Sequence, residues 1–222
     1  MELAAQAAGI GALADPTRRA LYEFVVSRPE PVGREEAATA LDLPGHKANF
    51  HLDRLVDEGL LEVEFRRLTG RTGPGAGRPA KLYRRADRDW SVSLPPRRYD
   101  LVGHLLAAGV ERAHRDQVAV EEALRDTAHD EGVAVGRAGR SPAATASLPD
   151  VLTHQGYEPR TEDDVLLLTN CPFDALAREH TTLVCSLNHA FVQGVAEGLD
   201  DPGVACLEPE PGHCCVKVRR GA

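Results

Sequence analysis

The sequence lacks the features of a membrane or secreted protein. No apolar run in its 222 residues approaches the roughly 18 residues that a membrane-spanning helix needs. The first residues, MELAAQAAGIGALAD, lack the basic flank of a signal peptide. We therefore expect a cytoplasmic protein with no membrane partner. Because thiols stay reduced in that compartment, the five cysteines are not expected to form a disulfide framework.

Sequence patterns of catalysis are also absent. No phosphate-cradling glycine-rich turn follows a predicted strand, and no cysteine–histidine pair comes with a third orienting residue. The sequence therefore argues against an enzyme. The alternative from that class is a thiol or redox enzyme that uses Cys171 or Cys185 as its nucleophile, which turnover of a thiol or disulfide substrate would reveal.

The charge is unevenly distributed along the chain. The net charge is −8, yet residues 1–90 carry 14 basic and 14 acidic residues, whereas residues 91–222 carry 12 basic and 20 acidic residues. An acidic body disfavours nucleic acid, so contact with DNA would require a locally basic surface. Residues 66–88 provide one, because they contain eight Arg or Lys and one acid, a net charge of +7.

Apolar residues at helical spacing predict a helix from about Pro44 to Glu58. Pro44 suits a first helical position, and Gly59 suits the residue just past the end. The buried stripe of this helix comprises Ala48, Leu52, Leu55 and Val56. The side chains off that stripe begin at the helix N-terminus, which suits a helix that lies in a DNA major groove: His46, Lys47, Asn49, Phe50 and Arg54.

The elements around this helix are also predicted from local patterns. Asp15 and Pro16 predict the start of a helix that ends near Ser27, and residues 33–41 predict a second, shorter helix. After Gly59, apolar residues alternate with charged ones in LEVEFR and again in AKLYRR, with a glycine-rich tip between them. This pattern predicts a β-hairpin.

The stretches LADPTRRALYEFV and REEAATALDLPGHKANFHLDRLVDEGLLEVE, with the Gly-Arg-Pro of the hairpin, resemble the winged helix-turn-helix of ArsR-like bacterial transcriptional regulators. The resemblance covers about residues 10–88. For His51 it implies a phosphate or base contact, with packing beneath the helix as the alternative. The basic wing adds Arg71, Arg78 and Lys81 as candidate DNA contacts, and Arg78, held by Pro79, would suit a narrow minor groove.

Two linkers are expected after the wing, at SVSLPPRRYD and at GRAGRSPAATAS. Between them, residues 97–136 predict one long helix. We expect it to pair with the same helix of a second chain, because one winged helix reads only half of an operator. Packing within its own chain is the alternative. We also expect this helix to transmit changes from the C-terminal part to the spacing of the two wings.

The remaining residues predict a small α+β domain. The expected elements are a helix at 148–155, strands at 157–160 and 165–169, helices that end at Leu199, and strands at 204–207 and 214–218. The predicted fold class is therefore α+β with three parts. These parts are a winged helix-turn-helix domain at 1–90, a linker and long dimerisation helix at 91–140, and a cysteine-containing sensor domain at 141–222.

All five cysteines lie in the last 52 residues: Cys171, Cys185, Cys206, Cys214 and Cys215. On one straight helix Cys171 and Cys185 would lie roughly 21 Å apart, too far to share a metal site. The Cys171–Pro172 pair and a cap at Thr181 or Thr182 instead predict two short helices. Each thiol would then lie near a helix N-terminus, where the helix dipole lowers its pKa and stabilises the thiolate that a metal requires.

A third ligand would come from Cys214 or Cys215. Neighbours on a strand point to opposite faces, so only one of them is expected to join the site. Shared parity with Val216 and Val218 favours Cys214, although a bend after Gly212 would reverse this. Cys206, within the sequence VACL, is expected to be a packed core cysteine.

The order NCPF, LVC and a final Cys-Cys strand is similar to the sensor half of iron–sulfur-responsive repressors of the SufR type, over about residues 148–218. The resemblance implies an Fe–S cluster on Cys171, Cys185 and one of Cys214 or Cys215. His180, His213 or a non-protein ligand would take the fourth position. Three thiolates and a histidine would equally suit tetrahedral Zn.

Together these features predict a non-enzymatic, homodimeric transcriptional regulator that binds double-stranded operator DNA and senses through an Fe–S cluster or Zn. The alternative function keeps the DNA-binding half but gives the C-terminal domain a pocket for a small organic effector. In that case the cysteines are structural, and DNA binding survives mutation of Cys171 and Cys185 to Ser.

Overall fold

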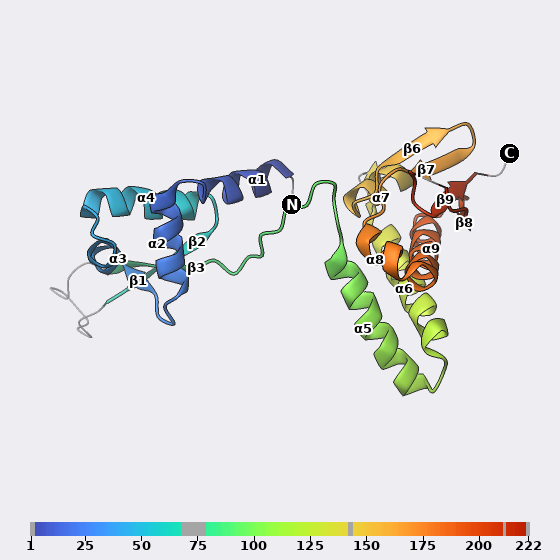
Figure 1. The fold of residues 1–222 in the computed structure, drawn as a ribbon, viewed down its shortest axis with the longest axis horizontal. Coiled ribbons are helices and arrows are strands. Elements are labelled where there is room, and N and C mark those ends of the chain that lie inside the picture. Colours follow the sequence, from blue (N-terminus) through green and yellow to red (C-terminus); the bar gives the residue numbers. More distant parts are fainter. Residues whose placement is uncertain (1–2, 68–78, 142–143, 211, 221–222) are drawn as a thin grey trace. The chain divides into compact units, whose positions relative to one another are not determined.

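A computed structural model describes residues 3–67, 79–141, 144–210 and 212–220. The chain divides into two compact units, Met1–Val92 and Ser93–Ala222 (Figure 1). No helix among the described residues is both long and apolar enough to cross a bilayer.

The first unit is built from four helices and a small antiparallel sheet among its described residues. In chain order the elements are α1 (Leu3–Ala12), α2 (Pro16–Val26), β1 (Val32–Gly33), α3 (Arg34–Ala40), α4 (Gly45–Asp57), β2 (Leu61–Arg66) and β3 (Ala80–Arg85). The strand order is β1-β3-β2. The three predicted helices and the hairpin strands are confirmed to within about two residues, whereas α1 was not predicted.

Local chemistry explains these boundaries. The Asp15 side chain accepts a hydrogen bond from the Arg18 amide at 2.9 Å, and Pro16 occupies the first position of α2. Gly59 adopts a φ of +75° just beyond α4, a conformation that favours glycine. The predicted stripe of α4 packs into the core of this unit, where Ala48, Leu52 and Leu55 are fully buried.

The second unit combines helices with a four-stranded antiparallel sheet of order β6-β7-β9-β8. Its helices are α5 (Tyr99–Asp116), α6 (Val120–Ala138), α7 (Leu148–His154), α8 (Asp174–Glu179) and α9 (Thr181–Gly198). Its strands are β4 (Arg140–Ser141), β5 (Ala144–Thr145), β6 (Pro159–Glu162), β7 (Val165–Leu168), β8 (Val204–Leu207) and β9 (Val216–Arg219). This confirms the mixed α and β content expected for the C-terminal part.

Two predictions about this unit are wrong. The single long helix at 97–136 is interrupted at Gln117, whose φ of +56° ends α5 and lets α6 turn back. Arg112 on α5 then pairs with Asp126 and Asp130 on α6, at 3.5 and 2.7 Å, so much of the predicted dimerisation helix packs within its own chain. The second linker is replaced by the end of α6 and by the β4–β5 pairing.

Helices α6 and α9 approach each other at backbone distance through glycines. A Cβ atom at Gly132 of α6 would lie 2.2 Å from the carbonyl oxygen of Phe191, and one at Gly194 of α9 would lie 2.2 Å from that of His129. Gly136 and Gly198, one helical turn further along, repeat this contact. Side chains larger than hydrogen are therefore excluded along the centre of this helix pair.

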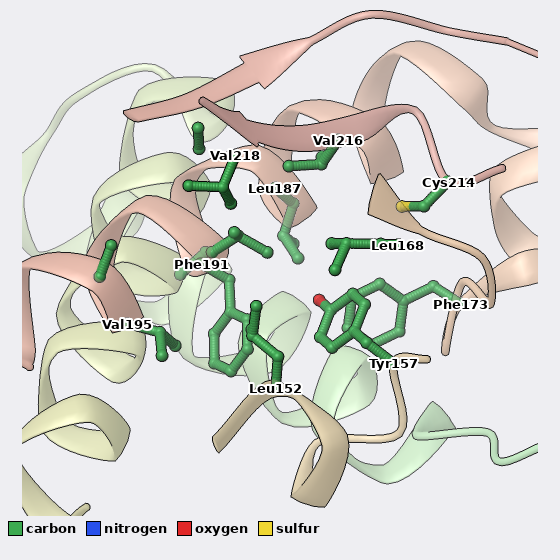
Figure 2. Close-up of a cluster of buried hydrophobic side chains, with 14 of the residues drawn as sticks. Leu152, Tyr157, Leu168, Phe173, Leu187, Phe191, Val195, Cys214, Val216 and Val218 are labelled. Carbon is green, nitrogen blue, oxygen red and sulfur yellow. The ribbon is translucent and has the colours of Figure 1, made fainter. Parts of the chain in front are cut away.

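The core of the second unit lies where α9 meets α7, the sheet and the segment before α8 (Figure 2). Tyr157, Phe173 and Phe191 are its largest fully buried side chains. Cys214 lies at the edge of this core, on the segment that leads into β9 (Figure 2). One of the predicted metal ligands is therefore part of the packed interior.

Candidate nucleic-acid interface and cysteine cluster

Helix α4 presents a polar outer face opposite its buried stripe. His46, Lys47, Phe50 and Arg54 are exposed, and Phe50 keeps 65% of its surface accessible. Arg54 also forms an ion pair with Glu58, one helical turn later. His46, Phe50 and Arg54, with Arg18, Asn49, Asp53 and Asp57, surround an open hollow on the surface of the unit. The face suits contact with a polyanion because its basic side chains are accessible.

Two of the predicted DNA contacts are engaged inside the protein by Asp53 of α4. Its carboxylate accepts hydrogen bonds from Lys81 Nζ at 2.5 Å, from the Tyr83 hydroxyl at 2.8 Å and from Asn49 Nδ2 at 2.9 Å. Burial raises the pKa of Asp53, but these hydrogen bonds outweigh burial and hold that pKa below its usual range. Lys81 and Tyr83 therefore tie strand β3 to helix α4, whereas Asn49 holds Asp53 from within the same helix.

His51 lies on the buried side of α4, with 7% of its surface exposed. Its ring meets that of Phe50 edge-on, with 5.3 Å between the ring centroids. Burial lowers the pKa of His51, and nearby Arg18 and Lys47 lower it further against the opposing effect of Asp15. His51 is therefore packed within this unit, and its predicted contact with DNA stays a prediction.

The described part of the hairpin is less basic than its charge count indicated. The count of +7 began at residue 66 and left out two acids on β2. Glu64 pairs with Arg66 at 3.0 Å, and Glu62 pairs with Arg84 across the strands at 2.7 Å. Arg71 and Arg78 lie outside the described residues, so their predicted contacts stay predictions.

The second unit gathers four cysteines from three separate segments. Cys171 lies in the loop between β7 and α8, Cys185 lies on α9, and Cys214 and Cys215 lie on the bend before β9. Cys171 shares a hydrogen bond with Cys214, Cys214 with Cys215, and Cys215 with Cys185. The predicted break between two helices, which falls at His180, is what brings Cys171 and Cys185 into one cluster.

Both adjacent cysteines reach the cluster, contrary to the expectation that only one would. Cys214 and Cys215 precede β9 and follow Gly212, whose φ of +84° turns the chain. Because they lie on a bend, the alternation of strand side chains does not apply to them. Cys214 is buried as predicted, with 2% exposure.

The expectation of lowered thiol pKa values is wrong. The hydrogen bond to Cys214 and then burial raise the pKa of Cys171 far above its usual range. The hydrogen bond from Cys171 lowers the pKa of Cys214, but that with Cys215 and burial outweigh it and raise the pKa to about 12. Burial likewise raises the pKa of Cys185, which lies in the second turn of α9 rather than the first. These thiols are therefore protonated near neutral pH.

The remaining candidate ligands differ from the predictions. Cys206 is half-buried rather than a core residue, because its neighbour Ala205 takes the inward position on β8. His180 is exposed between α8 and α9, whereas His213 has a buried Nδ1 with no hydrogen-bond partner among the described residues. In the described parts of the chain, no group of three or more His, Cys, Asp or Glu side chains is arranged to hold a metal ion.

A buried polar chain, not predicted from the sequence, leads from the core to the cysteine cluster. The Tyr157 hydroxyl donates a hydrogen bond to Asn188 Oδ1, and Asn188 Nδ2 donates to Cys214 Sγ at 3.1 Å. Asn188 is fully buried on α9. A signal existed, since an asparagine at the apolar spacing of Phe191 and Val195 requires a buried polar partner.

A comparison with protein families matches residues 13–64 to a helix-turn-helix domain. The matched residues run from just before α2 to within β2 and include α3 and α4. The chain therefore carries a helix-turn-helix domain of the kind found in DNA-binding transcriptional regulators. No curated protein and no solved structure matches the chain.

Proposed function

We propose that this chain is a dimeric transcriptional regulator that binds operator DNA through α4 and the β2–β3 wing, under the control of a metal group on the C-terminal cysteines. The observation that carries the proposal is the accessible basic face of α4 within the matched helix-turn-helix domain. A regulator of this kind needs no catalytic group of its own.

The DNA-binding roles divide between contact and positioning. His46, Lys47 and Arg54 are exposed on α4 and contact bases or phosphates in the major groove. Lys81 acts instead by fixing the wing against α4 through Asp53, and Asn49 orients the Asp53 carboxylate from within α4, because their hydrogen bonds are already used within the protein. The wing is therefore held at a set distance from the recognition helix before DNA arrives.

The dimer forms through the exposed face of α5. Tyr99, Gly103, Ala107 and Val110 recur at helical spacing, and Tyr99 and Val110 keep 42% and 54% of their surface accessible. The opposite face of α5 is occupied by α6 and the core. A second copy of the chain covers this apolar stripe, and the pair of winged helices then reads two half-sites.

The residue types of the cysteine cluster support a metal group, although their side chains are not already arranged around a single ion in the described residues. Cys171, Cys185, Cys214 and Cys215 form a chain of neighbouring sulfurs, and sulfur is the donor that Fe–S clusters and zinc accept. The buried Nδ1 of His213, next to Cys214 in sequence, has no hydrogen-bond partner in the described parts of the chain and is a further candidate donor. When bound, an Fe–S cluster would supply sensitivity to oxidants or to iron supply.

The protein residues prepare this site in two ways. The raised thiol pKa values mean that binding must release protons, so loading is favoured as pH rises. The amide of Asn188 donates to Cys214 Sγ and stabilises negative charge on that sulfur. Tyr157 keeps Asn188 in this orientation.

The DNA-binding part is tested by selecting duplexes from a random pool with the full-length protein and measuring affinity for the best one. Lys47→Ala is expected to weaken binding on the order of tenfold, the scale of losing one base or phosphate contact. Arg115→Ala, which removes an arginine exposed on α5, is the matched control. Equal affinity for wild type and Lys47→Ala would remove Lys47 from the interface.

The control part is tested by visible absorption with iron and zinc analysis on protein purified without oxygen. Brown protein with stoichiometric iron supports the cluster, and colourless protein with zinc supports a zinc site. Metal-free protein whose DNA binding survives Cys171→Ser and Cys185→Ser would replace both with the organic-effector function.

A further inference from the structure

The segment that connects the two units is held by the loop that carries Cys171. Between β3 and α5 the described chain has no regular secondary structure, and Leu94 is 72% exposed. Arg97 follows in this segment, and only 19% of its side-chain surface is accessible. Its partners determine how the connecting segment is anchored.

Arg97 reaches across to the cysteine loop with both ends of its guanidinium group. Nη1 donates to Asn170 Oδ1 at 2.5 Å and to the carbonyl oxygen of Cys171 at 3.0 Å. Nη2 lies 3.6 Å from the carboxylate of Asp174, at the start of α8. A largely buried guanidinium group must keep such acceptors, since an unpaired buried charge is strongly disfavoured.

Asn170 completes the contact from the other side. It is 6% exposed, and its Nδ2 donates to the carbonyl oxygens of Pro96 at 3.0 Å and Gly156 at 2.6 Å. The backbone amide of Arg98 donates to the carbonyl oxygen of Pro172 at 3.1 Å. We call these two facing segments, Pro96–Arg98 and Asn170–Pro172, the clasp.

We propose that the clasp transmits the state of Cys171 to the connecting segment, and through it to the DNA-binding unit. This inference rests on the proposed metal control of the cysteine cluster. The Cys171 carbonyl is held by Arg97, while the thiol of the same residue is hydrogen-bonded to Cys214. If binding of a metal group by the Cys171 thiol displaced the backbone of this loop, the Cys171 carbonyl would move, and Arg97 would have to follow or lose an acceptor.

The clasp also acts on the start of α5. The carbonyl oxygen of Arg98 accepts the hydrogen bond from the Val102 amide that opens this helix. A shift at Pro172 therefore moves both the exit of the connecting segment and the first turn of the proposed dimer helix. This route replaces the predicted transmission along one continuous helix, which the turn at Gln117 interrupts.

The test compares operator affinity of the full-length protein in two states, reconstituted with ferrous iron and sulfide without oxygen, and stripped with a chelator. The variants are Arg97→Gln, Arg97→Lys and the control Arg115→Gln, at an arginine 68% exposed on α5. In Arg97→Gln we expect the operator affinities of the loaded and the stripped protein to differ by no more than about twofold. Its iron content and visible spectrum stay those of the wild type.

Amide hydrogen exchange at Arg98 gives a readout that does not depend on DNA. In Arg97→Gln this exchange is expected to become on the order of tenfold faster, while Arg115→Gln leaves it unchanged. Arg97→Lys keeps the charge and a donor toward the Cys171 carbonyl, so its ratio and its exchange rate are expected between those of wild type and Arg97→Gln.

Each outcome decides the proposal. If Arg97→Gln keeps the wild-type ratio of loaded to stripped affinity, the clasp does not transmit the state of Cys171, while the proposed metal-controlled regulator is unaffected. If Arg97→Gln fails to fold or to load iron, a wild-type ratio in Arg97→Lys combined with fast Arg98 exchange overturns the clasp equally. A wild-type protein whose affinity does not differ between the two states refutes the proposed metal control, and the clasp with it.

Discussion

The close approach of α6 and α9 makes Gly132 a residue that alanine cannot replace. A Cβ atom at this position would lie 2.2 Å from the carbonyl oxygen of Phe191 and 2.9 Å from the backbone nitrogen of Val195. An ordinary carbon–oxygen contact is about 3.3 Å, so the two helices would have to separate by about 1 Å. The obstacle is backbone, which cannot move aside as a side chain can.

The size of the effect follows from two opposing contributions. Alanine favours the helix over glycine by about 1 kcal/mol. Forcing extra volume into a packed interior costs about 1–3 kcal/mol, and the rigid backbone contact places this position at the upper end. Gly132→Ala is therefore expected to lower the free energy of unfolding of the second unit by about 2 kcal/mol.

The assay is urea denaturation followed by two probes at once. Trp90 is the single tryptophan and packs in the first unit, so its fluorescence reports that unit, whereas circular dichroism at 222 nm reports the helices of both. Gly132→Ala should lower the urea midpoint of the second unit, which circular dichroism detects, and should leave the midpoint of the Trp90 fluorescence transition unchanged. The control is Gly11→Ala on α1, where a Cβ meets nothing within 4 Å and alanine should not destabilise. A Gly132→Ala variant as stable as wild type would refute the reasoning.

Three further predictions concern the polar contacts and the dimer. Tyr157→Phe leaves the buried Oδ1 of Asn188 without its donor, so the second unit should lose about 1–3 kcal/mol of stability in urea denaturation; a loss below about 0.5 kcal/mol would count against the buried chain. The pKa of Asp53 is lowered from its usual 3.8 on folding, so its carboxylate stabilises the first unit above that pH and this stability is lost as pH falls through the folded pKa. Trp90-monitored denaturation should therefore show a deficit for Asp53→Asn at pH 6 that disappears in acid, and a deficit that persists unchanged would contradict the ionic origin. Gly103→Arg places a charge on the exposed stripe of α5 and should convert dimers to monomers in sedimentation, with Arg115→Gln as the variant that stays dimeric.

Local pattern was enough to predict the DNA-binding half of the chain. The apolar stripe of α4, the cap at Asp15, Gly59 past the helix end and the alternation in β2 and β3 each involve residues close in sequence. Their preferred conformations agree with the tertiary fold, so the elements appear where the sequence predicts them. The helix break at His180 was predicted for the same reason.

What the sequence could not determine depends on which residues meet across the fold. The pairing of Lys81 with Asp53 joins residues 28 positions apart and turns a predicted DNA contact into an internal tie. The turn at Gln117 is decided by the packing of α5 on α6, since the polar pattern of residues 97–136 suits one long helix as well as two. The thiol pKa values depend on burial and on neighbouring sulfurs that only the folded chain brings together. Sequence thus determined the elements and the residue types available for function, whereas tertiary packing decided which of those side chains remain accessible and which hold one another.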